Sequence, residues 1–181
     1  FEDAALRTIG LIGEATSVSR VCLLEKAPSS SIQLIRSELE WNAKTGIVGR
    51  TRSPLSMRLK NDDEGSIIED VFVQEKTIYS LVKDLKGSDR RILEPEGVKS
   101  ILLVPIKTKT DIWGAVGFLE TNSERIWSRK EISALEIGSS PIGSALMRFE
   151  AGENLEKSEK QFRTLAQNIP GIVFRVSLAG S

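Results

Sequence analysis

The segment KSILLVPIK, residues 99–107, is followed after only four residues by a second apolar segment, IWGAVGFLE, residues 112–120. Both have the length of a β-strand and are apolar at nearly every position. This pattern is typical of strands in a sheet that is covered on both faces. The short connection between them indicates a hairpin. These two segments are therefore predicted to lie at the centre of a sheet. Elements from the rest of the chain are expected to cover both faces of that sheet.

The flanking sequence alternates between helical and strand patterns. Apolar residues at helical spacing predict helices, and short β-branched runs predict strands. Residues 44–63 are rich in Gly, Ser, Asn and Asp and are expected to be mostly loop. The expected helices are residues 3–15, 66–74 and 88–94, and the expected strands are residues 18–24, 32–41 and 78–82.

A long helix is expected to begin at Ser128, because Ser128 and Glu131 have the spacing of a capping box. Pro141 lies inside this helix and predicts a kink or break just before it. Beyond Pro141 the apolar positions approximate heptads, with a six-residue step that contains Gly152. This seam predicts pairing in a dimer, and the alternative is that it packs on the chain's own first helix. Its members are Ile142, Ala145, Phe149, Leu155, Phe162 and Leu165, and Ile169 continues the pattern.

The composition excludes several classes of function. The chain has 25 basic and 25 acidic residues and no His. It therefore has no global attraction to nucleic acid, and catalytic triads, His-ligated metals and a phosphoacceptor histidine are impossible in it. No apolar run reaches the length of a membrane helix, so no membrane contact is expected. The one Cys fits a reducing compartment, which predicts a cytoplasmic location. Because the chain starts at Phe1, we expect it to be a piece of a larger protein.

Several linked motifs resemble the GAF domain family. These are LEPEGVKSILLVPI at residues 93–106, WGAVGF at 113–118, ERIWS at 124–128 and Glu40-Trp41. The resemblance covers about residues 1–150 and implies an α+β fold related to PAS domains. Such a fold has a central antiparallel sheet of five or six strands with helices on both faces, the first and last helices on the same face. A long C-terminal linker helix would follow.

A second resemblance begins where the first ends. Residues 155–175, LEKSEKQFRTLAQNIPGIVFR, look like the linker helix and opening strand of a PAS domain. This implies a linker or signalling helix over residues 151–169 and a truncated PAS domain over residues 170–181. A GAF-helix-PAS order is similar to that of multi-sensor histidine kinases.

The GAF resemblance implies a small-molecule pocket between the sheet and its second helical layer. Cys22 could ligate haem or attach a bilin, but it lies in an apolar strand, where a buried and inert thiol is the usual outcome. Bilin sites normally pair the cysteine with His, the cyclic-nucleotide signature of GAF domains is missing, and methionine sulfoxide reductases of this fold need several cysteines. Gly114, Gly117, Gly138 and Gly143 lack a phosphate-loop Lys and are predicted to be close-packing positions. No metal site is predicted, the cofactor stays unknown, and the pocket candidates are Leu23, Trp41, Phe72, Tyr79, Ile92, Leu102, Trp113 and Phe118.

The predicted function is therefore sensory rather than enzymatic. The chain would sense a small molecule and relay the signal, through a homodimer formed by its first and last helices, to PAS and histidine kinase modules of a phosphorelay. Two alternatives remain open. One is a ligand-free dimerisation spacer, and the other is the sensory domain of a transcription regulator.

Overall fold

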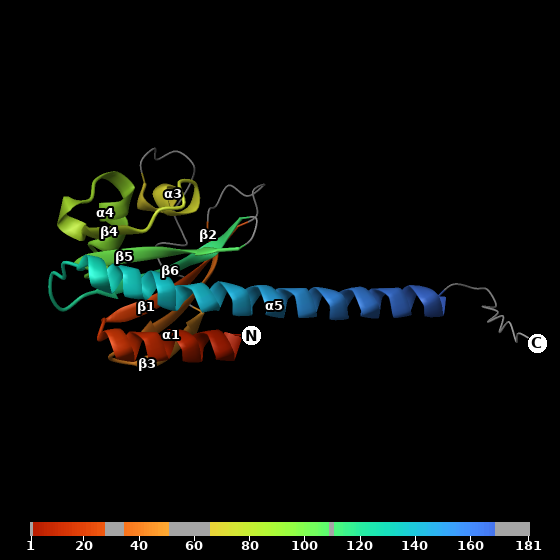
Figure 1. Ribbon diagram of the computed structural model, residues 1–181. Coiled ribbons are helices and arrows are strands. Elements are labelled where there is room, and N and C mark those ends of the chain that lie inside the picture. The colour runs from red at the N-terminus through yellow and green to blue at the C-terminus, as the bar shows by residue number, and fades with distance from the viewer. Residues whose placement is uncertain (1, 28–34, 51–65, 109–110, 169–181) are drawn as a thin grey trace, which may run out of the picture. The chain divides into compact units, whose positions relative to one another are not determined.

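The computed structural model describes residues 2–27, 35–50, 66–108 and 111–168 (Figure 1). By its internal contacts the chain divides into two units, residues 1–146 and 147–181, and the division falls inside the last helix. The elements are α1 (Glu2–Thr16), β1 (Arg20–Lys26), β2 (Ile35–Asn42), β3 (Gly46–Arg50), α3 (Ile67–Phe72), β4 (Ile78–Leu81), the 3₁₀ helix η1 (Val82–Asp84), α4 (Gly87–Leu93), β5 (Ser100–Lys107), β6 (Ile112–Glu120) and α5 (Arg129–Asn168).

The first unit is built on a six-stranded sheet in the order β3-β2-β1-β6-β5-β4, and every neighbouring pair is antiparallel. The predicted hairpin is confirmed: β5 pairs with β6, and Leu102 lies opposite Phe118. This agrees with the expected sheet of five or six strands. The sheet accounts for the apolar character of both segments, because they are central strands.

The prediction that residues 44–63 are mostly loop is wrong for residues 46–50, which form β3. Gly46 adopts a φ of 77°, which glycine tolerates without steric cost, and turns the chain back so that β3 pairs with β2. Strand formation there depends on this pairing rather than on local apolar alternation. Residues 51–63 lie outside the described part of the chain.

Helices cover both faces of the sheet, as expected, and alternate residues of β1, β5 and β6 enter two separate cores. α1 and the start of α5 lie on one face, and α3 and α4 lie on the other (Figure 1). We call the first core the α1 cluster; it comprises Ala5, Leu6, Ile9, Val18, Val21, Leu23, Leu39, Trp41, Leu102, Val104, Ile106, Val116, Phe118, Trp127 and Ile142. The second, the α3 cluster, comprises Cys22, Leu24, Ile67, Ile68, Val71, Phe72, Val82, Ile92, Leu93, Val98, Ile101, Leu103, Ile112, Ala115 and Leu119.

Small residues let these layers approach closely. A Cβ on Gly13 of α1 would lie 2.2 Å from the Trp41 ring of β2, so α1 packs directly on that indole. The close-packing prediction holds for Gly143, whose Cβ would meet Ile106 at 2.6 Å, and for Gly114 and Gly117. It is wrong for Gly138, where an added Cβ would meet, among the described residues, no atom within 4 Å outside the neighbouring backbone of its own helix.

The capping box at the start of α5 is confirmed. The Ser128 N–H donates to Glu131 Oε2 at 2.8 Å, and the Glu131 N–H donates to Ser128 Oγ at 3.3 Å. Of the kink or break expected at Pro141, the break is wrong, because α5 continues through this residue. The carbonyl that loses its donor belongs to Ile137, which is 75% exposed, so water can satisfy it, while Ile142 anchors the next turn in the α1 cluster.

Glu131 gives the start of α5 a pH dependence. Hydrogen bonds from the Ser128 hydroxyl and N–H, together with the Arg125 guanidinium, lower the pKa of Glu131 from 4.5 to about 2. A lowered folded-state pKa means that the carboxylate stabilises the fold fully above pH 4.5 and loses this effect as the pH falls toward 2. We expect Glu131→Gln to lower the free energy of unfolding by about 1 kcal/mol at pH 7.

Urea titrations of the parent and of Glu131→Gln at pH 7 and pH 3 check this prediction. The difference between the two proteins should narrow at pH 3. An equal difference at both pH values would contradict the assignment to the ionised carboxylate.

Among the helices of the described residues, none is long and apolar enough to cross a membrane.

Candidate functional site

The eight pocket candidates are divided between the two faces of the sheet. Leu23, Trp41, Leu102 and Phe118 are buried in the α1 cluster, and Trp113 packs against it. Phe72 and Ile92 belong to the α3 cluster, and Tyr79 is 56% exposed. Periodicity could not separate these sets, because both faces of the central strands are apolar. Of the eight, Phe72 and Ile92 lie in the layer where the GAF resemblance places a ligand.

Cys22 lies in β1 and is 1% exposed within the α3 cluster. A Cβ added to Gly117, its partner on β6, would lie 2.4 Å from the Cys22 sulfur. The thiol thus fills space that this glycine leaves. No group of three or more potential metal ligands comes together among the described residues.

A buried carboxylate joins α3 to α4 on the second face. Asp89 of α4 is 5% exposed and accepts hydrogen bonds from the Ser66 hydroxyl and the Ile67 N–H, both at 2.9 Å. Ser66 in turn caps α3 by accepting from the Ile68 N–H. The serine before an apolar stripe was a detectable capping signal. Nothing in the sequence pattern marked Asp89, whose partner lies 23 residues away.

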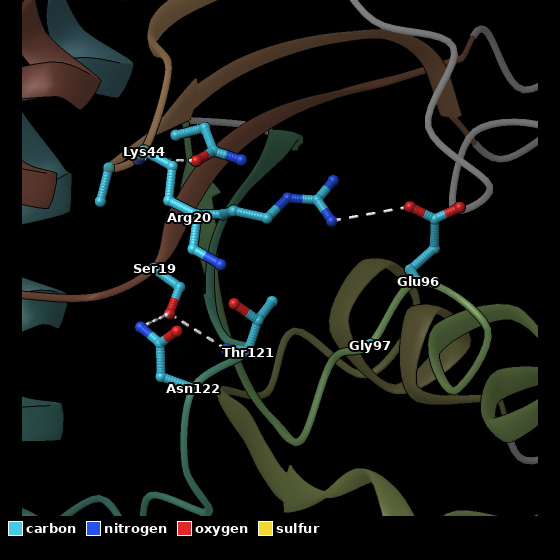
Figure 2. Close-up of a pocket in the computed structure, with 9 residues that line it drawn as sticks. Ser19, Arg20, Lys44, Glu96, Gly97, Thr121 and Asn122 are labelled. Atoms are coloured by element: carbon cyan, nitrogen blue, oxygen red, sulfur yellow. Dashed lines mark hydrogen bonds and ion pairs between the residues drawn. The ribbon is translucent and has the colours of Figure 1, made fainter.

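A surface cavity of about 380 Å³ lies at one end of the sheet, where β1 begins and β2 and β6 end (Figure 2). Neither its position nor its lining was predicted, because its residues come from four separate segments. A second hollow of about 490 Å³, lined by Gly13, Glu14, Trp41 and others, shares Ser19, Ala43 and Asn122 with it. The residues that line the first cavity are Ser19, Arg20, Asn42, Ala43, Lys44, Glu96, Gly97, Thr121 and Asn122.

Arg20 is the central charged group of this cavity. Its Nε and Nη2 donate to the two carboxylate oxygens of Glu40 at 2.7 and 2.9 Å. Its Nη1 lies 3.7 Å from Glu96 Oε2 (Figure 2). Burial opposes the charge, but the hydrogen bond and the negative charge of Glu40 outweigh it and raise the pKa of Arg20. The guanidinium therefore stays charged, and two of its N–H groups already donate to Glu40.

A polar network closes the floor of the cavity. The Ser19 hydroxyl donates to Glu120 and accepts from the Thr121 N–H and from Asn122 Nδ2, both at 3.1 Å. The Asn122 N–H donates to Glu120 Oε1 at 3.0 Å. Ser19 and Glu120 are 6% and 5% exposed. These groups satisfy one another, so they hold the end of the sheet together and leave few donors for a ligand.

The residues of the predicted helical seam occupy different environments. Ile142 is 7% exposed and lies in the α1 cluster, which also contains Ile9 of α1. Ala145 is exposed. In the second unit, Phe149 is 36% exposed, and Leu155, Phe162 and Leu165 are 63%, 75% and 65% exposed. Residues 169–181, including the expected opening of a PAS domain at 170–181, lie outside the described part of the chain.

Comparison with known proteins identifies the fold and the family. The chain is 30% identical over 162 residues to the "Methanogenesis regulatory histidine kinase FilI" of Methanothrix harundinacea (strain 6Ac). This match covers 90% of the chain but 18% of that kinase, so the chain spans only a small part of its relative.

Two solved structures have a similar fold. One is the red-light-absorbing state of the red/green cyanobacteriochrome NpR6012g4, with a TM-score of 0.61, 19% identity and coverage of 83% of this chain and 96% of that one. The other is the GAF domain of a two-component sensor histidine kinase from Bacillus halodurans, with a TM-score of 0.54, 16% identity and coverage of 79% and 92%. The family profile described as "GAF domain" matches residues 1–146, ending just before the boundary expected at residue 150. The chain therefore belongs to the GAF domain family.

Proposed function

We propose that this chain is a sensory module that regulates a histidine kinase and passes its signal along α5. The observation that carries the proposal is the 30% identity to a regulatory histidine kinase over 90% of the chain. Because the chain contains no His, the phosphoacceptor of such a kinase would lie outside it. The chain itself would act by binding and conformational change rather than by catalysis.

The second unit supports a relay through a paired helix. Leu155, Phe162 and Leu165 follow heptad spacing and are each more than 60% exposed. Exposed apolar residues at this spacing on a helix are stabilised when a second helix covers them. We propose that a second copy of the chain does so, which makes the module a homodimer and the helix a continuous path toward a downstream PAS domain.

The sensed molecule is proposed to be small and to act on the α3 and α4 layer. That layer holds Phe72 and Ile92 and is organised by the buried Asp89–Ser66 contact. α3 is a helix of only six residues, and such an element has few internal hydrogen bonds to hold it. Its position therefore depends on tertiary contacts, which a ligand can change.

A chimera tests the function. Residues 1–181 replace the aligned segment of the Methanothrix kinase, and autophosphorylation is measured with labelled ATP. Two further chimeras carry insertions in α5 between Glu159 and Lys160, one of two alanines and one of seven residues. An α-helix turns about 100° per residue, so the first insertion rotates the seam by about 200° and the second returns it nearly to register.

We expect the two-residue insertion to change autophosphorylation at least fivefold, about the lower end of allosteric couplings, and the seven-residue insertion to restore it. The matched insertions separate loss of register from mere lengthening. Equal activity of all three chimeras would contradict the relay and favour the spacer alternative.

A further inference from the structure

Arg125, in the segment between β6 and α5, contacts two helices at once. Its Nη1 donates to the backbone oxygen of Thr16 at 3.0 Å, and its Nη2 donates to Glu131 Oε1 at 2.9 Å. The centre of its guanidinium lies 4.2 Å from the centroid of the Trp127 ring. Its own N–H donates to the hydroxyl of Ser100 at 2.7 Å. The side chain is thus fixed by three different groups, and the backbone of the same residue is fixed by a fourth, the Ser100 hydroxyl.

These groups belong to the ends of α1 and α5. Thr16 is the last residue of α1, and Glu131 is in the first turn of α5, where the capping box with Ser128 also holds it. Trp127 is 4% exposed and packs near Phe118 in the α1 cluster, with ring centroids 6.2 Å apart. α1 itself packs on β1, β2 and β3. Arg125 therefore joins a helix anchored on one side of the sheet to the start of the helix proposed to leave the domain.

A guanidinium suits this position for physical reasons. Its planar fork presents several N–H groups, so it can donate to a carbonyl and a carboxylate in different directions and still stack on an indole. The carbonyls at the end of α1 carry the negative end of the helix dipole and attract a cation. Arg125 is only 26% exposed, so water screens these contacts less than those of a fully exposed ion pair. A lysine could make only part of this set.

We infer that Arg125 is a positioning residue that couples the end of α1 to the first turn of α5, so that a displacement of α1 is passed to α5. Its part in signalling rests on the proposed function, whereas the coupling between the two helices does not. The ERIWS segment thereby combines a cap, a core aromatic and a helix-to-helix link in five residues.

Hydrogen exchange of the 181-residue chain tests the coupling. Leu6→Ala disturbs α1 at a buried position distant in sequence from Arg125. The readout is the exchange rate of the amides of residues 132–136 in α5, divided by that of residues 91–93 in α4 to remove any global loss of stability. Leu6→Ala should speed this normalised exchange about tenfold in the parent, because the interaction energy between contacting groups commonly corresponds to a factor of about ten. In the Arg125→Met background Leu6→Ala should have no such effect, because the contact between the two helices is gone.

Two further variants keep the test decisive. Lys26→Met removes an ion pair with Asp111 elsewhere on the sheet and should leave the tenfold effect intact. Arg125→Lys keeps the charge but makes only part of the contacts, so in this background Leu6→Ala should speed the normalised exchange only about threefold. This variant replaces Arg125→Met in the test if Arg125→Met does not fold. An unchanged tenfold effect of Leu6→Ala in either Arg125 variant would overturn the inference. If the chimeric kinases fail to respond while the exchange coupling is present, the proposed function is wrong but the coupling stands.

Discussion

Gly114→Ala is expected to lower the free energy of unfolding by about 3 kcal/mol, at the upper end of what overpacking a core costs. Gly114 lies in β6, opposite Glu25 of β1 on one side and Ile106 of β5 on the other. A Cβ at this position would lie 2.0 Å from the backbone oxygen of Leu24. That oxygen belongs to a paired strand and cannot rotate away as a side chain could. The methyl group must therefore push β1 and β6 apart at the centre of the sheet.

Gly138→Ala is the matched control. Gly138 lies inside α5, and in the described part of the chain an added Cβ would meet no other element within 4 Å. The same substitution should therefore raise stability by about 0.5–1 kcal/mol through helix propensity. Urea unfolding followed by circular dichroism measures both variants. If Gly114→Ala remains within 1 kcal/mol of the parent, β1 and β6 are less closely packed than the structure shows.

Asp89→Ala is expected to cost about 3 kcal/mol. It removes the acceptor for the Ser66 hydroxyl and the Ile67 N–H, and both residues are 5% exposed. Each buried donor left without a partner costs roughly 1–3 kcal/mol. Asp89→Asn keeps one acceptor oxygen and a similar volume, so it should cost about half as much. The loss should be local first, with faster amide exchange at Ile67 and Ile68 of α3.

Asp111→Ala is the control for this prediction. Like Asp89, Asp111 accepts a hydrogen bond from a side chain, that of Lys26, and another from a backbone N–H, that of Ile112. Unlike Asp89, its side chain is 64% exposed. Water can replace it, so its removal should cost less than 1 kcal/mol. Urea unfolding of both variants gives the comparison. Equal losses would show that burial of Asp89 does not matter and that α3 is held by its apolar residues alone.

The sequence predicted the elements whose signals are local. The hairpin of β5 and β6, α1 and the start of α5 were all expected, because each depends on a run of apolar residues or on a cap within one segment. The capping box is the clearest case, since Ser128 and Glu131 lie three residues apart and need no other part of the chain. The family was identified from the resemblance of several motifs to GAF domains, because the periodicity of apolar residues does not distinguish one family from another.

The misses have a common cause. β3 forms because Gly46 returns the chain to β2, and α5 continues through Pro141 because Ile142 is anchored on the sheet. In both cases a tertiary contact outweighs a local preference that pointed the other way.

The site depended even more on tertiary structure. Alternation could not tell which face Leu102 and Leu103 would take, because both sides of a central strand are apolar; the structure places Leu102 in the α1 cluster and Leu103 in the α3 cluster. Asp89 meets Ser66 across 23 residues, and Arg125 meets Thr16 across 109. The sequence by itself determined the central hairpin, the cap of the last helix and, through motif resemblance, the family, since each of these signals lies within a single segment. Only the tertiary structure decided which charged groups meet, because a hydrogen bond needs its two partners within about 3 Å and the chain brings them together only by folding.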